Sequence, residues 1–97
     1  MLTSKQRSKL KSMASTMPVV TSVGKNGITD SLLKSLSDTL EARELIKIGI
    51  LENSGEDPAE VADNLAQLLD AEVVIVMGRK AVLYRYSSRD HYAHIEL

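Results

Sequence analysis

The sequence lacks several residue types on which whole classes of protein depend, with no cysteine, tryptophan or phenylalanine and only two prolines among 97 residues. The absence of cysteine excludes disulfides, thiolate zinc sites, iron–sulfur clusters and cysteine nucleophiles, so the core must be purely hydrophobic. No apolar run approaches the roughly 20 residues that cross a bilayer, and the N-terminus lacks the apolar stretch of a secretory signal. We therefore expect a soluble, cytoplasmic protein.

The remaining composition is typical of a single folded domain. Hydrophobic residues make up 43% and charged residues 26% of the chain, which argues against a disordered tail and a low-complexity repeat. A chain of this length has room for one core. We expect one domain across residues 1–97, with its core in residues 2–86 and a polar tail in residues 87–97.

Charge is unevenly distributed along the chain, although the formal net charge is only −1. Residues 1–47 carry eight basic and four acidic side chains, whereas residues 48–97 carry four basic and nine acidic ones. Such segregation is typical of a protein that presents one basic face to a polyanion and keeps an acidic face in water. An ordinary solvated surface is the alternative.

Hydrophobic periodicity predicts three helices and four short strands. The helices are expected at residues 4–16, at residues 30–42, and from Pro58 through Leu69, and the strands at residues 18–23, 45–51, 73–77 and 81–86. Capping residues mark the helix starts, namely Thr3 with Gln6, Thr29, and Asp57 with Pro58 and Glu60.

The resulting order is αβαβαββ, which contains two strand–helix–strand crossovers and a terminal hairpin. Crossovers of this kind favour parallel pairing, and the hairpin requires antiparallel pairing. We therefore expect an α/β (α+β) fold, in which helices pack on a mixed four-stranded sheet.

The loop Gly24-Lys25-Asn26-Gly27 joins the first strand to the second helix. Glycines let a backbone approach a phosphate chain closely and permit a positive φ, while the following helix supplies unpaired N–H groups. Lys25 adds a point charge and Asn26 both a donor and an acceptor, which suits a sugar–phosphate backbone. Asp30, in the first turn of the helix, would repel a nearby phosphate. A connector chosen for turn geometry alone is the alternative.

Other basic residues are candidates for phosphate contact. They are Lys5 and Lys9 on one flank of the first helix, Arg7 and Lys11 on its other flank, and Arg79, Lys80 and Arg85 near the hairpin. The first helix could instead be a solvated surface, a membrane-surface helix or an organelle transit peptide. The alternative interpretation of the hairpin residues is that they simply form an ordinary solvated surface.

Two further patterns have a structural and a functional interpretation. Tyr84 and Tyr86 would share one side of the sheet, where tyrosines either stack on bases or cover packing between helix and sheet. His91 and His94 have metal-ligand spacing but no convincing third ligand. No nucleotide-binding fingerprint and no nucleophile–base arrangement is recognisable. We expect no cofactor, no metal and no catalytic residue.

Four segments together resemble the CRM domain (chloroplast RNA splicing and ribosome maturation), across about residues 2–86. These segments are Lys5–Arg7, Val23–Thr29, Glu44–Ile48 and Gly78–Arg85. The chain is most similar to stand-alone, bacterial YhbY-like members of that family. The resemblance implies a fold similar to the C-terminal domain of bacterial translation initiation factor three, and an RNA-binding module whose GxxG loop contacts RNA. It also implies association with precursors of the large ribosomal subunit.

The working hypothesis is a non-catalytic, monomeric RNA-binding protein that acts on large-subunit ribosomal RNA or the pre-50S particle. Its contacts would be Gly24, Lys25, Asn26 and Gly27, with Lys5, Lys9, Arg79, Lys80 and Arg85 in support. Neither membrane binding nor DNA specificity is expected. The alternative hypothesis is an adaptor that docks a basic ribosomal protein through the acidic face of the third helix.

Overall fold

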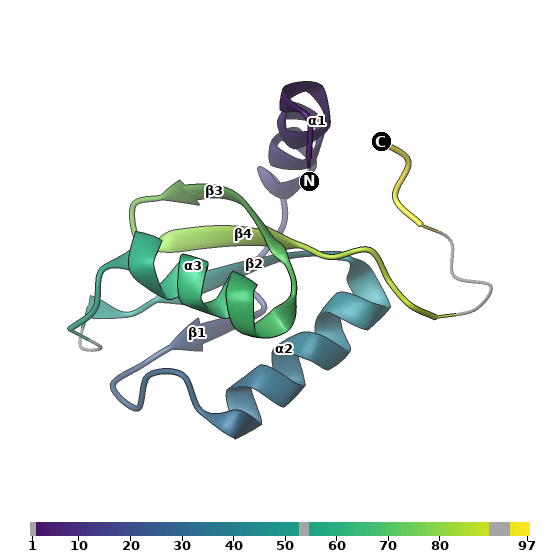
Figure 1. Cartoon of the computed structure of the whole chain (residues 1–97). Coiled ribbons are helices and arrows are strands. Elements are labelled where there is room, and N and C mark those ends of the chain that lie inside the picture. The colour runs from purple at the N-terminus through teal and green to yellow at the C-terminus, as the bar shows by residue number, and fades with distance from the viewer. Residues whose placement is uncertain (1, 53–54, 90–93) are drawn as a thin grey trace.

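The computed structural model describes residues 2–52, 55–89 and 94–97, and within these ranges the chain has the expected αβαβαββ order (Figure 1). The helices are α1 (Ser4–Ala14), α2 (Asp30–Arg43) and α3 (Pro58–Leu69), and the strands are β1 (Thr21–Val23), β2 (Leu45–Ile50), β3 (Glu72–Met77) and β4 (Lys80–Tyr84). The first helix therefore ends two residues earlier than predicted, and β1 is only half as long as its β-branched segment suggested.

The four strands form one mixed sheet in the order β1-β2-β4-β3. β1 pairs in parallel with β2, with Thr21 opposite Ile48, and the crossover through α2 is as expected. The second crossover, through α3, joins β2 to β3, but these strands do not pair. The hairpin folds β4 back between them, so that β4 is antiparallel to both neighbours.

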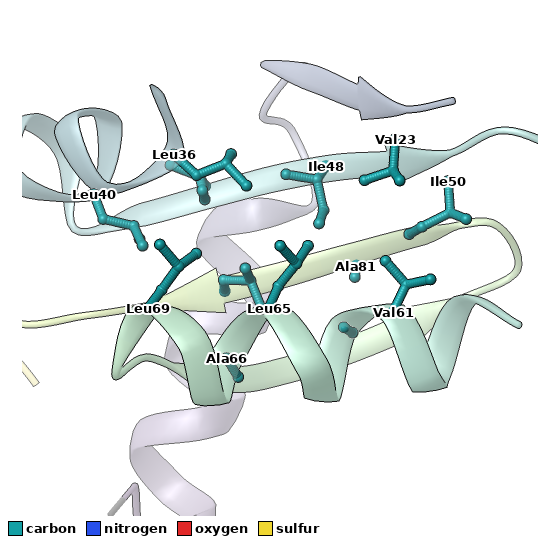
Figure 2. Close-up of a cluster of buried hydrophobic side chains, with 13 residues drawn as sticks. Val23, Leu36, Leu40, Ile48, Ile50, Val61, Leu65, Ala66, Leu69 and Ala81 are labelled. Carbon is teal, nitrogen blue, oxygen red and sulfur yellow. The ribbon is translucent and has the colours of Figure 1, made fainter. Parts of the chain in front are cut away.

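Both faces of the sheet are buried, which explains the mostly apolar sequence of β2, where Lys47 is the charged residue. Ile46, Ile48 and Ile50 belong to the cluster on the side of α2 and α3, and Figure 2 shows Leu36 of α2 and Leu65 of α3 on either side of Ile48. On the opposite face, Leu10 of α1 packs with Leu45. All six residues of β2 are consequently buried, and the two clusters together make the sheet the middle layer of the domain.

The helix starts are capped largely as predicted. Thr3 and Gln6 form a complete capping box, and the Thr29 side chain accepts a hydrogen bond of 3.1 Å from the Leu32 N–H. At α3, Asp57 is the N-cap residue but makes no side-chain capping bond, so the predicted second capping box is wrong. Pro58 at the first helical position lacks an N–H, so the helix start already has one donor fewer to satisfy.

A buried carboxylate fixes the end of the sheet where β2 begins and β4 ends. Glu44, fully buried, accepts hydrogen bonds from the Ser87 N–H at 2.7 Å and the Ile95 N–H at 2.8 Å, and it pairs with His94. Burial alone raises the pKa of Glu44, but these hydrogen bonds and the His94 charge outweigh it and hold that pKa below its ordinary value. The carboxylate thereby fastens the C-terminal segment to the sheet.

Candidate nucleic-acid interface

One end of the sheet collects three connections, and we call it the loop end. β1 and β2 are parallel and both finish there, so the segments 24–29 and 51–57 leave from neighbouring positions, with 53–54 outside the described residues. The turn between β3 and β4, at Gly78 and Arg79, lies at the same end. Figure 1 shows the loop after β1 standing clear of the helices before α2 begins.

Local backbone geometry gives the loop a fixed shape. The Gly27 N–H donates a 3.0 Å hydrogen bond to the Gly24 carbonyl, and Gly27 has a φ of 65°, a conformation that glycine adopts without steric cost. Thr29 then caps α2, and its own side chain is used for that purpose. The positive φ anticipated for this loop is therefore present at its second glycine.

The polar side chains at the tip of the loop have no partner elsewhere in the described part of the chain. Lys25 and Asn26 are exposed and make no hydrogen bond or ion pair there. They border a hollow of about 500 Å³ whose wall also carries the hydroxyls of Thr21, Ser31 and Ser35. A hollow with a cation, an amide and several hydroxyls at its edge can accept a phosphate or a ribose by hydrogen bonding. Sequence reasoning missed the hydroxyls, although serine and threonine are frequent in residues 21–35.

The two hairpin cations have different surroundings. Arg79 donates hydrogen bonds to the carbonyls of Ile50 at 2.8 Å, Leu51 at 3.0 Å and Glu56 at 3.3 Å, so it fastens the chain that leaves β2. Lys80 is exposed and, among the described residues, has no side-chain partner. The structure brings both to the loop end, but only Lys80 keeps all its donors for a ligand.

The cations of α1 lie apart from this end. Lys5 and Lys9 are exposed on a helix that packs on the opposite face of the sheet from α2, and they border a separate hollow together with Leu97. On the other flank, the Arg7 guanidinium donates to the carbonyls of Val73 and Val74 and anchors α1 on β3. Of the predicted helix cations, Lys5, Lys9 and the exposed Lys11 thus remain available but are not part of the loop end.

Arg85 is used inside the protein. Its guanidinium donates to the Leu69 carbonyl at 2.9 Å, to the Ser37 carbonyl at 2.8 Å and to Glu41 at 3.2 Å, joining the end of α3 to α2. Glu41 also accepts hydrogen bonds from the Ser88 N–H and hydroxyl, which lower the pKa of Glu41 further than burial raises it. This cation lies beyond the end of β4 that is farthest from the loop end.

The tyrosines and histidines of the C-terminal part also have structural surroundings. Tyr84 is buried beneath α1, and burial together with the nearby Glu44 charge raises the pKa of its phenol. Tyr86 is exposed and stacks on His94, with ring centroids 3.8 Å apart. His91 lies outside the described residues. The described ranges contain no group of three or more residues suited to hold a metal ion.

With the geometry in place, comparison with known proteins identifies the family. Residues 2–85 match the CRS1 / YhbY (CRM) domain. The chain belongs to the CRM domain family. The matched range includes all the helices and strands of the αβαβαββ domain. It also includes the GxxG loop. In the part of the chain that the structure describes, no helix is both long and apolar enough to span a membrane.

Three relatives of this CRM domain are informative. The chain is 39% identical over 90 residues to "Probable RNA-binding protein YqeI" of Bacillus subtilis, which covers 93% of this chain and 94% of the relative. It is 30% identical to "Probable RNA-binding protein PA4753" of Pseudomonas aeruginosa, with 87% and 81% covered. The solution structure of SAV1595 from Staphylococcus aureus superposes with a TM-score of 0.78 at 40% identity, covering 93% of this chain and 94% of that chain.

Proposed function

We propose that this CRM domain is a non-catalytic RNA-binding protein that assists assembly of the large ribosomal subunit. The observation that carries the proposal is the pair Lys25 and Asn26, exposed at the tip of a loop fixed by Gly27 and without internal partners in the described chain. Relatives named as RNA-binding proteins support the ligand class. The ribosomal target rests on the resemblance to YhbY-like members, and it implies action in the cytoplasm.

The proposed contact has two parts. Lys25 and Asn26 bind phosphate and ribose, while the hydroxyl-lined hollow and the N–H groups at the start of α2 bind the neighbouring backbone. Lys80 neutralises a further phosphate at the same end. Lys5 and Lys9 form a second contact, reached by an RNA that extends around the domain. Arg85 is not included, because its guanidinium is largely buried and is bonded to Leu69, Ser37 and Glu41 within the fold.

The proposal is tested by fluorescence-anisotropy binding of large-subunit ribosomal RNA fragments at several salt concentrations. If three to five phosphates are neutralised, log affinity falls against log salt with a slope of roughly −2 to −4, at about −0.7 per phosphate for single strands. A DNA of the same sequence is the comparison for RNA preference. Binding that does not respond to salt would contradict this mechanism.

A pair of charge reversals locates the site. Lys25→Asp and Arg43→Asp each replace one positive by one negative charge, but Arg43 is an exposed residue in the last turn of α2, away from the loop. We expect Lys25→Asp, alone or with Asn26→Asp, to abolish most binding with an unchanged circular dichroism spectrum, and Arg43→Asp to have a small effect. Equal losses from both would indicate a diffuse electrostatic interaction instead of a loop site.

A second candidate function is favoured by the outer face of α3. Glu60 and Asp63 are exposed there, and α3 has no basic residue. This acidic face suits a basic protein. A pull-down of ribosomal proteins that survives nuclease treatment but is lost in Glu60→Lys with Asp63→Lys would support an adaptor, whereas loss of the complex on nuclease treatment alone would support RNA bridging.

A further inference from the structure

A row of four residues crosses the whole sheet at the loop end. Ser22 of β1 is the register partner of Gly49 of β2, Gly49 pairs with Lys80 of β4, and Lys80 pairs with Met77 of β3. Direct partners point to the same face of a sheet. We call Ser22, Gly49, Lys80 and Met77 the cross-sheet row.

The cross-sheet row lies on the face that α1 covers elsewhere. Side chains alternate between the two faces of a strand, so Val82 and Tyr84 lie on the same side of β4 as Lys80. Both pack in the cluster beneath α1. α1 does not extend over the row itself, since Ser22, Lys80 and Met77 are exposed, Met77 by 44%. This face is therefore covered at one end and open at the other.

The open part is a groove of about 640 Å³ with an apolar floor and charged edges. Besides the cross-sheet row, Val19 and Leu51 line it, and Leu51 is 47% exposed. A Cβ on Gly49 would lie 3.1 Å from the Ser22 hydroxyl oxygen and 3.6 Å from a methyl carbon of Val19, so these two side chains close over the buried Gly49 and form the floor. Arg79, Lys80 and Glu52 stand around the groove.

The groove is continuous with the candidate RNA site. Ser22 lines both the groove and the hollow beside the GxxG loop. Leu51 links them as well, because its Cδ1 atom would lie 3.7 Å from a Cβ placed on Gly24. A strand whose backbone is bound at Lys25 therefore passes the mouth of the groove.

We propose that this groove is a subsite for an unpaired RNA base, a proposal that rests on the function proposed above. Its apolar floor and the Glu52 carboxylate disfavour a phosphate inside, whereas the flat face of a base matches the exposed Leu51 and Met77 side chains. Methionine is flexible and polarisable, and its sulfur makes favourable contacts with aromatic rings. Lys80, at the edge, then meets the phosphate attached to the inserted nucleotide.

Two exposed methionines allow a matched test. Met77→Ala removes the side of the groove, while Met13→Ala removes a similarly exposed methionine, 38% exposed on α1. The probes are a fluorescent single-stranded RNA of about 12 nucleotides containing all four bases and the same ribose–phosphate chain with abasic nucleotides at its centre. Both variants are checked for folding by circular dichroism, and binding is measured across a salt series.

We expect Met77→Ala to weaken binding of the complete RNA about two- to tenfold, to leave its salt slope unchanged and to leave binding of the abasic chain unchanged. Met13→Ala is expected to bind both probes like the wild type. Ultraviolet crosslinking followed by mass spectrometry is expected to give a nucleotide adduct on the peptide that contains Met77 or Leu51.

Each contrary result has a distinct meaning. If Lys25→Asp abolishes RNA binding but Met77→Ala leaves it unchanged, the base subsite is wrong and the loop site stands. Equal weakening of both probes by Met77→Ala also overturns the subsite, because the lost contact is then not with a base. If the wild type binds neither these probes nor the large-subunit ribosomal RNA fragments, the proposed function fails and the subsite with it. If it binds the fragments but neither probe, the base subsite is wrong and the proposed function stands. Loss of a nuclease-resistant protein complex in Met77→Ala, with RNA binding intact, would make the occupant a protein.

Discussion

The two ends of the sheet use charged side chains in opposite ways. At the end that holds Glu44, which we call the far end, Arg85 and Glu41 bond to each other, to backbone groups and to Ser88. At the loop end, Lys25 and Lys80 face solvent without a partner in the described chain. The far end uses its hydrogen bonds to hold elements together. At the loop end Arg79 does the same, whereas Lys25 and Lys80 keep their donors for the proposed RNA ligand.

The choice between arginine and lysine separates the internally bound cations from the unbound ones at both ends of the sheet. Arg7, Arg79 and Arg85 each bind more than one backbone carbonyl, a task suited to the several donors of a planar guanidinium. Lysine carries a compact, mobile charge that gains less from a fixed internal position. In this domain, therefore, we assign a basic residue to the proposed RNA interface only when its donors are not already bound inside the fold.

The largest effect is expected from removing the far-end carboxylate. Glu44→Ala leaves the N–H groups of Ser87 and Ile95 without their acceptor and should lower the free energy of unfolding by about 2–4 kcal/mol. Denaturant unfolding measures this loss. RNA affinity of the folded protein should stay the same, and a parallel loss of affinity would show that the two ends are coupled.

Acid should weaken the same network without any mutation. The pKa values of Glu41 and Glu44 are lowered in the fold, so the folded state binds fewer protons than the unfolded state around their ordinary value of 4.5. Their stabilisation is complete above that pH and is lost as the pH falls below it. We expect the Tm to fall more steeply from about pH 5 to about pH 3 in the wild type than in Glu44→Gln. Parallel curves would contradict the assignment to Glu44.

Arg85 tests whether a cation predicted for RNA contact is structural. Arg85→Met removes its bonds to Leu69 and Ser37 and should cost about 1–3 kcal/mol in unfolding free energy, with RNA affinity unchanged. Arg43→Met, at an exposed position, is the matched control and should stay within about 0.5 kcal/mol. Reduced RNA affinity in a stable Arg85→Met protein would return Arg85 to the interface.

The smallest change in stability is expected at Lys80. Lys80→Gln should alter the unfolding free energy by less than about 0.5 kcal/mol, because the side chain has no partner in the described residues. If it neutralises one phosphate, the salt slope of RNA binding becomes less negative by roughly 0.7. The double variant Lys5→Gln with Lys9→Gln is a useful comparison. It should change the salt slope only for an RNA long enough to reach α1. An unchanged slope in Lys80→Gln would remove Lys80 from the interface.

Local features of this fold were predictable from sequence because neighbouring residues determine them. The capping box at Thr3, the cap at Thr29 and the positive φ at Gly27 depend on residues within a few positions. The buried strand β2 was visible as a mostly apolar segment, although the burial of Lys47 within it was not. The family followed from four short segments, each of which can be recognised in the sequence without knowledge of its neighbours in space.

Features that depend on distant partners were not predictable in this way. The position of β4 between β2 and β3 is set by pairing between residues far apart, such as Leu45 with Tyr84. From the sequence alone, Arg85 cannot be distinguished from an ordinary surface cation. Its structural role depends on the carbonyls of Leu69 and Ser37, which only the folded chain places beside it. The groove at the loop end needs one residue from each of four strands, so no single segment of the sequence contains its pattern.

The place of β4 in the sheet has a consequence for how the protein is made. The last strand along the chain is an inner strand, so during synthesis β2 and β3 emerge before the strand that joins them exists. Until residues 80–84 are available, the core lacks Ala81 and Leu83, and the cross-sheet row lacks Lys80. A partly translated chain therefore has a GxxG loop but no completed sheet behind it, and the domain folds as a unit only when its final strand arrives.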